Sequence, residues 1–256
     1  MYHPAVLEFS GVGKCYGAGP PDERAAWALR GVDLKVGPGE VLGLLGPNRA
    51  GKTTLAKLAL SLCAPTEGRV VRFDRPASDR RTLARVGYAP EAPAFPTDMT
   101  AEGLLWYLGA VGGLPRSALR ERVPGLLRRF GLDDRAREPV GRFSKGMLRR
   151  LSLAQALLGE PSLFVADEPT EGLDLDGLRR FRGVVAELSA GGCAVVLITH
   201  MTAEVEHLCT RAAVLVAGRK VYDGPLDDLP GRRRGDQGKG RGLEPCLAEL
   251  YQGAAV

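Results

Sequence analysis

Three features are missing from the sequence, and each absence excludes a class of protein. The five cysteines form no C-x-x-C pair and are scattered along 256 residues, which is typical of reduced thiols and predicts a cytoplasmic protein. The first residues, MYHPAVLEFS, contain no basic segment followed by an apolar core, so no secretory signal is predicted. The longest apolar runs, such as Cys193–Ile198, are far shorter than the about 20 residues of a membrane-spanning helix. If the protein works at a membrane, we expect another polypeptide to span it.

The composition, 45% hydrophobic and 25% charged, predicts a globular protein rather than a disordered or fibrous one. The net charge is +5, but residues 231–242 alone carry five basic side chains and one acidic side chain, so the rest of the chain is nearly neutral. We interpret this glycine-rich segment as a solvated tail, with a tether to acidic lipid headgroups as the alternative. We therefore expect a domain over residues 1–230 and a basic tail over 231–256, with a final helix from Glu244 to Gln252.

Six apolar runs have strand character, and several are continuous rather than alternating. These runs are Val6–Phe9, Val41–Leu45, Arg85–Ala89, Leu163–Ala166, Ala194–Thr199 and Ala212–Val216. Continuous apolar strands separated by helical segments predict an α/β fold whose parallel sheet is covered on both faces. Leucine, arginine, alanine and glutamate at helical spacing predict a helical subdomain over about residues 95–160. The segment AGRKVYDG predicts a hairpin with Gly218 in its turn.

A phosphate-binding loop is predicted at GPNRAGKTT, which fits the pattern G-x-x-x-x-G-K-T. The loop follows an apolar strand and precedes a helix-like segment, which is the context that the motif requires. Its backbone amides can converge on phosphate oxygens, Lys52 adds positive charge, and Thr53 offers a hydroxyl to Mg²⁺. The nucleotide-binding residues expected in the loop are Gly46, Pro47, Asn48, Arg49, Ala50, Gly51, Lys52, Thr53 and Thr54.

A second candidate site is LFVADEP, where an apolar strand ends in two acidic residues. Ligands of parallel sheets collect at the carboxyl ends of the strands. Asp167 is suited to hold Mg²⁺, and Glu168 could accept a proton from the water that attacks a terminal phosphate. Alone, this stretch would be a strand that ends in a solvated acidic turn. Together with the phosphate loop, it predicts a magnesium–nucleotide site.

The motif FSKGM, Phe143–Met147, lies just upstream of the acidic strand and begins the helix-like segment SKGMLRRLSLAQALL. In this order, the motifs resemble those of ATP-binding cassette (ABC) ATPases, whose signature loop is similar to FSKGM. Without the other motifs, the serine and glycine would be only a helix-capping turn. The resemblance covers residues about 4 to 225 and implies the ABC type of P-loop NTPase core, with a small antiparallel β subdomain and a helical insertion. It also implies hydrolysis of ATP with Mg²⁺.

The same resemblance implies that two ATP molecules bind between two subunits, so that one phosphate loop faces the partner's signature loop. Ser144 and Gly146 would then contact the partner's nucleotide. Asp174, in EGLD, would lie in the loop that crosses the interface. Tyr16, in GKCYG, would stack on adenine, and its alternative interpretation is a half-buried strand tyrosine.

Three residues complete the site that the resemblance implies. His200 would contact the terminal phosphate and form the catalytic set with Glu168 and Lys52. Glu91, in GYAPE, stands where the family has a glutamine that contacts magnesium and senses the membrane partner. The expected metal ligands are therefore Thr53, Glu91 and Asp167. His3 and His207 have no such match, and their surroundings do not predict a zinc site.

Two further residues depart from the family pattern, Arg49 inside the phosphate loop and Glu171 where serine is frequent. The guanidinium of Arg49 could reach phosphate or the partner's Glu171. Alternatively, it points to water, where an ion pair is worth only ~0 to 1 kcal/mol. A third interpretation is backbone strain, because glycine permits angles that arginine resists.

The sequence is most similar to the separate ATPase subunits of bacterial ABC-2 type exporters. This resemblance implies a peripheral protein on the cytoplasmic face of the membrane, with a separate integral-membrane permease as partner and no nucleic acid. It would dimerise with itself or with a related ATPase. An alternative is a soluble ABC ATPase that acts on a ribosome or nucleic-acid complex, and another is a module that binds ATP without hydrolysing it. The transported substrate cannot be inferred, because its contacts would lie in the permease.

Overall fold

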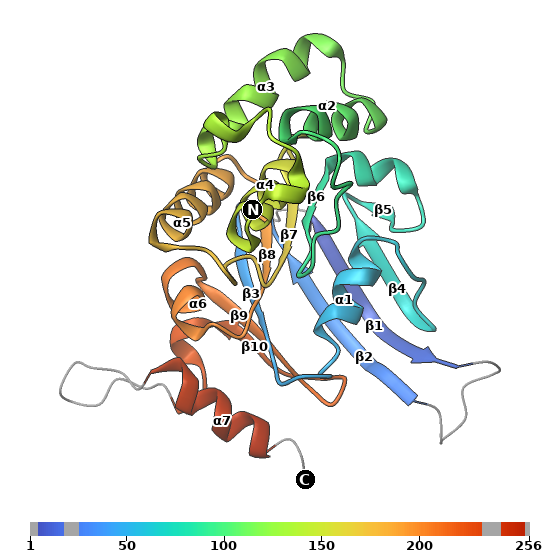
Figure 1. The fold of residues 1–256 in the computed structure, drawn as a ribbon. Helices are drawn as coiled ribbons and strands as arrows, with labels where there is room; N and C mark the ends of the chain where they lie inside the picture. The colour runs from blue at the N-terminus through green and yellow to red at the C-terminus, as the bar shows by residue number, and fades with distance from the viewer. Residues whose placement is uncertain (1–4, 18–25, 232–241, 254–256) are drawn as a thin grey trace.

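A six-stranded sheet forms the centre of the protein, in the order β10-β9-β3-β8-β7-β6 (Figure 1). All neighbours in it pair in parallel except β10, which forms an antiparallel hairpin with β9. The structure is a computed structural model that describes residues 5–17, 26–231 and 242–253. The strands are β3 (Val41–Leu45), β6 (Val86–Ala89), β7 (Leu163–Asp167), β8 (Ala194–Ile198), β9 (Arg211–Val216) and β10 (Arg219–Pro225).

A second, antiparallel sheet has the order β2-β1-β4-β5. Its strands are β1 (Leu7–Tyr16), β2 (Ala26–Val36), β4 (Glu67–Arg72) and β5 (Arg75–Pro76). Buried and exposed residues alternate in much of β2, which is the pattern of a sheet with only one face against the core.

Helices surround the two sheets and are unevenly distributed (Figure 1). In that view α2 and α3 lie at one end of the molecule, whereas α7 lies at the opposite end and contacts α6. The α-helices are α1 (Lys52–Ala59), α2 (Ala101–Val111), α3 (Arg116–Arg129), α4 (Lys145–Ala156), α5 (Leu175–Ala190), α6 (Thr202–Leu208) and α7 (Leu243–Gly253). The short 3₁₀ helices are η1 (Arg80–Arg85), η2 (Asp133–Arg135), η3 (Val140–Arg142) and η4 (Leu226–Asp228).

Alternate residues of the central strands belong to two different hydrophobic cores. In β3, Leu42 and Leu44 pack with α1 and the antiparallel sheet, whereas Val41 and Leu45 pack with the core formed by α2 to α7. The same division holds in β7, where Leu163 and Val165 lie in the first core. Both faces of the sheet are therefore covered, which explains why its strands read as continuous apolar runs.

The predicted α/β fold with a small antiparallel β part is confirmed, and so is the hairpin, whose turn residues Ala217 and Gly218 have φ of 47° and 77°. The prediction of β1 was too short, because pairing with β2 and β4 carries the strand to Tyr16. Strands β2 and β4 were not predicted at all. A helix ends the described chain, as expected. The subdomain boundaries stay predictions, and the basic stretch 232–241 lies outside the described residues.

The end of the helix that follows the phosphate loop is held by a fully buried arginine. Arg72 in β4 is 0% exposed, and its guanidinium donates to the carbonyls of Ala59 and Ala77 and to the hydroxyls of Ser61 and Thr82. Carbonyls at a helix end carry partial negative charge, so a cation there is stabilising. Arg72 thereby fixes the far end of α1 against the antiparallel sheet.

We predict that Arg72→Met lowers the free energy of unfolding by about 2–4 kcal/mol, because it leaves buried carbonyl and hydroxyl groups without their donor. Chemical denaturation measures this change. The control is Arg75→Met in the same sheet, because Arg75 is 59% exposed and its ion pair with Asp79 is worth less than about 1 kcal/mol. Equal losses in the two variants would contradict the assignment.

Candidate functional site

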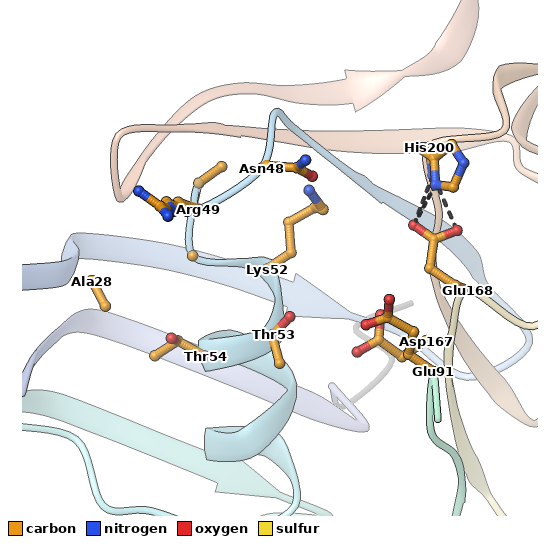
Figure 2. Close-up of a pocket in the computed structure, with 12 residues that line it drawn as sticks. Ala28, Asn48, Arg49, Lys52, Thr53, Thr54, Glu91, Asp167, Glu168 and His200 are labelled. Atoms are coloured by element: carbon orange, nitrogen blue, oxygen red, sulfur yellow. Dashed lines mark hydrogen bonds and ion pairs between the residues drawn. The ribbon is translucent and has the colours of Figure 1, made fainter. Parts of the chain in front are cut away.

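A pocket of about 680 Å³ opens at the edge of the central sheet where β3, β7 and β8 end. Residues from five separate stretches of the chain line it, and Figure 2 draws them as sticks. The lining consists of Ala28, Asn48, Arg49, Ala50, Gly51, Lys52, Thr53, Thr54, Glu91, Asp167, Glu168 and His200. The structure therefore brings together most of the phosphate loop, the acidic strand end, Glu91 and His200, as the sequence predicted.

The phosphate loop runs from the end of β3 into α1 and encloses the lysine ammonium. Lys52 Nζ donates to the carbonyl oxygens of Gly46 at 2.5 Å and Pro47 at 3.0 Å. Burial lowers the pKa of this ammonium, whereas the nearby Glu168 and Asp167 carboxylates raise it. Among the described residues, Lys52 is thus a preorganised cation whose hydrogen-bond partners are backbone oxygens.

Two glycines are required by close contacts of the loop. A side chain at Gly46, where φ is 148°, would collide with the carbonyl oxygen of Leu215 in β9. At Gly51, where φ is 106°, a Cβ atom would lie 2.6 Å from the carbonyl oxygen of Ala28. Gly51 also begins α1 without a side-chain cap, so the first amides of the helix keep no side-chain acceptor and suit an anion.

Arg49 has a φ of 67°, in the left-handed region that only glycine adopts without a steric penalty. Its side chain is exposed, and in Figure 2 it lies on the side of the loop away from Glu168 and His200. The strain considered from the sequence is therefore present in the backbone.

Three oxygen-bearing side chains meet below the lysine: the Thr53 hydroxyl and the carboxylates of Glu91 and Asp167 (Figure 2). Burial, together with the charges of Glu91 and Glu168, raises the pKa of Asp167 to about 6. This excess of negative charge would be offset by a divalent cation. Within the described residues, no group of three or more His, Cys, Asp or Glu side chains could hold a metal on its own. The donor set suits Mg²⁺, which binds one or two carboxylates and completes its shell with phosphates and water.

Glu168 and His200 are in direct contact at the ends of β7 and β8. His200 Nδ1 lies 2.9 Å from Glu168 Oε1, and the His200 amide donates to the same carboxylate at 3.1 Å. Thr199, which the sequence analysis missed, donates its hydroxyl to the other oxygen at 2.9 Å. The backbone of Glu168, whose side chain makes these contacts, is in the left-handed region, with φ of 47°. The carboxylate is only 12% exposed and is held at a fixed position in the pocket.

Six predicted site residues lie outside the lining of the pocket. Two of them, Gly46 and Pro47, belong to the phosphate loop, and the other four come from elsewhere in the chain. The hydroxyl of Tyr16 contacts the pocket residue Thr54, and the residue is 47% exposed. Ser144 and Asp174 begin α4 and α5 and accept hydrogen bonds from the amides of Met147 and Gly177. The fourth is Gly146 in α4, where a Cβ atom would lie 2.8 Å from the carbonyl oxygen of Gly172.

Comparisons with known proteins agree with this geometry. Residues 29–171 match the sequence profile of the ABC transporter family. An uncharacterised ABC transporter ATP-binding protein of Nostoc sp. is 38% identical over 96% of this chain and 76% of its own length. The Nod factor export ATP-binding protein I of Rhizobium sp. is 36% identical over 86% of this chain and 70% of its own length.

This chain belongs to the ABC transporter ATPases. A solved ATP-binding subunit of an ABC transporter superposes with a TM-score of 0.85 and 31% identity, over 96% of this chain and 99% of that one. A dimeric ATP-binding cassette bound to ADP and phosphate shares the fold, with a TM-score of 0.77 and 24% identity over 86% of this chain and 98% of its own. As a member of this family, the chain is an ATPase that binds ATP.

Glu171 has a partner within the chain, in the segment Phe143–Met147 that resembles a signature loop. Lys145 Nζ lies 2.5 Å from Glu171 Oε1 and holds the pKa of that carboxyl below its usual range. Both side chains are largely solvated, at 69% and 41% exposure, so the pair contributes little to stability. A contact of Glu171 with the partner's Arg49 would compete with this ion pair.

We predict that Arg49→Gly raises the free energy of unfolding of this ABC ATPase by about 0.5–1 kcal/mol, because glycine tolerates the left-handed φ. Arg49→Ala is the control, since it removes the guanidinium but keeps the Cβ atom that causes the strain. Urea denaturation of both variants measures the difference. An equal gain in stability from alanine would show that the side chain, not the backbone angle, is responsible.

Proposed function

We propose that the chain is the ATP-hydrolysing subunit of an ABC exporter, which dimerises around two Mg-ATP and drives a separate membrane-spanning permease. The observation that carries this proposal is that the pocket is lined by only some of the residues expected to contact the nucleotide. The phosphate loop, the acidic edge and His200 line it, whereas Ser144, with its hydroxyl at the start of α4, lies outside. A second subunit supplies the missing groups.

Within each site, the protein mainly positions and neutralises the phosphates. The loop amides and Lys52 bind them, and Thr53, Glu91 and Asp167 hold Mg²⁺. The bound ion supplies charge stabilisation on the phosphate oxygens. Tyr16 stacks on the adenine from beyond Thr54.

Glu168 acts as the general base for the attacking water. Its carboxylate accepts hydrogen bonds from Thr199 and the His200 amide, which fix its direction. The imidazole of His200, now 2.9 Å from Glu168, lies where it can turn to the terminal phosphate. A carboxylate has about four lone-pair sites, so Glu168 can keep these hydrogen bonds and still accept the proton of the attacking water.

Pairing places Ser144, Gly146 and the start of α4 against the partner's nucleotide, and Asp174 at the seam between the subunits. The N-terminus of a helix favours phosphate. The solved cassette that is bound to ADP and phosphate is a dimer. Two copies of this chain, or this chain and a related ATPase, form the dimer.

The export direction follows the relatives named for Nod factor export. Within the described residues, no helix is both long and apolar enough to cross a membrane, so a separate permease is part of the proposal. The ATPase binds at the cytoplasmic face through the segment 92–99, in which Ala94 is exposed and Phe95 packs partly against the helical core.

We predict that Glu168→Gln retains ATP binding and lowers hydrolysis by at least about 100-fold, because the amide keeps the shape of the side chain but cannot accept the proton. Phosphate release and equilibrium nucleotide binding measure the two effects. Glu160→Gln is the control, since Glu160 is 70% exposed and pairs with Arg122 outside the pocket.

The tagged Glu168→Gln protein, purified with ATP from detergent-solubilised membranes of its native cell, identifies the partner by mass spectrometry. The proposal expects a multi-spanning membrane protein that is retained with ATP and lost without it. Recovery of ribosomal or DNA-bound proteins instead would overturn the exporter assignment and favour the soluble ABC ATPase.

A further inference from the structure

Arg149, in the middle of α4, is a buried arginine to which the sequence motifs assign no role. It is only 2% exposed, although arginine is almost never buried unless its charge is paired or hydrogen-bonded. Its guanidinium donates to the backbone oxygens of Pro90 at 2.6 Å and Glu91 at 2.5 Å. Its Nε atom is buried and has no hydrogen-bond partner among the described residues. The contact between α4 and the segment after β6 is therefore made by the two forked nitrogens.

The surroundings of Arg149 are strongly acidic, although it forms no ion pair within 4.0 Å among the described residues. Burial lowers its pKa, whereas Glu171, Glu91, Glu168 and Asp167 raise it. In turn, Arg149 is one of the charges that lower the pKa of Asp167. The positive charge of Arg149 thus offsets the negative charge of the carboxylates in the proposed metal and catalytic sites, without forming hydrogen bonds to their oxygens.

The contact between Arg149 and the segment after β6 links two residues with proposed roles, Ser144 and Glu91. Helix α4 begins at Ser144, which in the proposed dimer faces the partner's nucleotide. The backbone that accepts these hydrogen bonds from Arg149 includes Glu91, a proposed ligand of the metal that the same subunit would bind. Arginine presents its donors in a rigid planar fork, so two hydrogen bonds fix both distance and direction. Movement of α4 is therefore transmitted to the Glu91 backbone.

We propose that Arg149 is a positioning residue that holds Glu91 at the metal site and couples its position to α4. The inference rests on the proposed roles of Glu91 and Ser144 within the ATPase. Arg149 itself touches neither nucleotide nor metal and acts through the Glu91 backbone. Loss of the fork would loosen Glu91 while leaving the phosphate loop intact.

Arg150 provides a matched control on the same helix. It also donates to two backbone oxygens, those of Phe130 at 3.2 Å and Gly131 at 3.1 Å, which lie at the end of α3 and just after it. Neither Arg150 nor its partners line the pocket. Arg150 uses the single nitrogen Nη1 for both bonds, whereas Arg149 uses Nη1 and Nη2. Arg149→Lys and Arg150→Lys thus each alter an arginine of the same helix that donates to two backbone oxygens, but only one of the two contacts leads to Glu91.

The first measurement is amide hydrogen exchange of the segment 86–95 in the nucleotide-free protein. We expect Arg149→Lys to speed exchange after β6, since the segment loses a two-point attachment, and Arg150→Lys to leave it unchanged. Exchange rates that are equal in both variants would overturn the proposal. This readout needs neither ATP, metal nor a membrane partner, so it is independent of the exporter assignment.

The second measurement is the Mg²⁺ concentration that gives half-maximal ATP hydrolysis by the isolated ATPase. Supporting groups around metal ligands commonly contribute 10–100-fold, so we expect an increase of about 10-fold for Arg149→Lys. Metal-free ATP binding should change less than about twofold, because the phosphate loop is untouched. In a Glu91→Ala background, Arg149→Lys should have no further effect on the Mg²⁺ requirement.

A purely structural role gives a different pattern. In that case, Arg149→Lys would lower stability, leave the Mg²⁺ requirement unchanged, and add its effect equally in the Glu91→Ala background. That result would overturn the inference even if the proposed export function were correct. The less conservative variant Arg149→Gln serves as a second test should lysine restore the contact with a single donor.

Discussion

The parallel register of three neighbouring strands is the constraint on which the site depends. Leu44 in β3 pairs with Ile198 in β8, and Ile198 pairs with Asp167 in β7, so these strands end at one level. The phosphate loop, Glu168 and His200 therefore leave the sheet at the same edge. A slip of one residue in β7 would turn Asp167 to the opposite face and move Glu168 away from His200. The two hydrophobic cores that pack against the two faces of the sheet exclude such a slip, because it would exchange the side chains between them.

Charged side chains are concentrated at this edge of the sheet, although the burial of each one alone is energetically unfavourable. Asp167 is buried next to two other carboxylates, and Lys52 is half-buried with backbone oxygens as its hydrogen-bond partners. Such an arrangement is unfavourable without a ligand and becomes favourable when Mg²⁺ and phosphates bring opposite charges. The strained backbones of Arg49 and Glu168 fit the tendency of strain to collect at functional sites. The fold thus supplies a preorganised but incomplete electrostatic site.

The sequence predicted the parts of this site that follow directly after buried strands. The phosphate loop and the Asp167–Glu168 strand end could be found because motif spacing and the apolar strands before them are local features, whereas the role of His200 was implied by the family resemblance. Strands β2 and β4 could not, since charged residues interrupt their apolar residues, and β4 pairs with β1, which is distant in the chain. Arg149 was missed because a helical arginine ordinarily predicts an exposed face, and only tertiary packing buries it. The left-handed angle of Arg49 and the contact between Glu168 and His200 likewise depend on three-dimensional geometry.

The central proposal is that two subunits build each site, one with its phosphate loop and the other with its signature loop. Mixing two inactive variants, Lys52→Ala and Ser144→Arg, tests it most directly through the rate of ATP hydrolysis. Mixed dimers contain one site with both an intact Lys52 and an intact Ser144, so an equal mixture should recover about a quarter of the native rate. A mixture as inactive as its two components, or full activity of Ser144→Arg alone, would contradict the account.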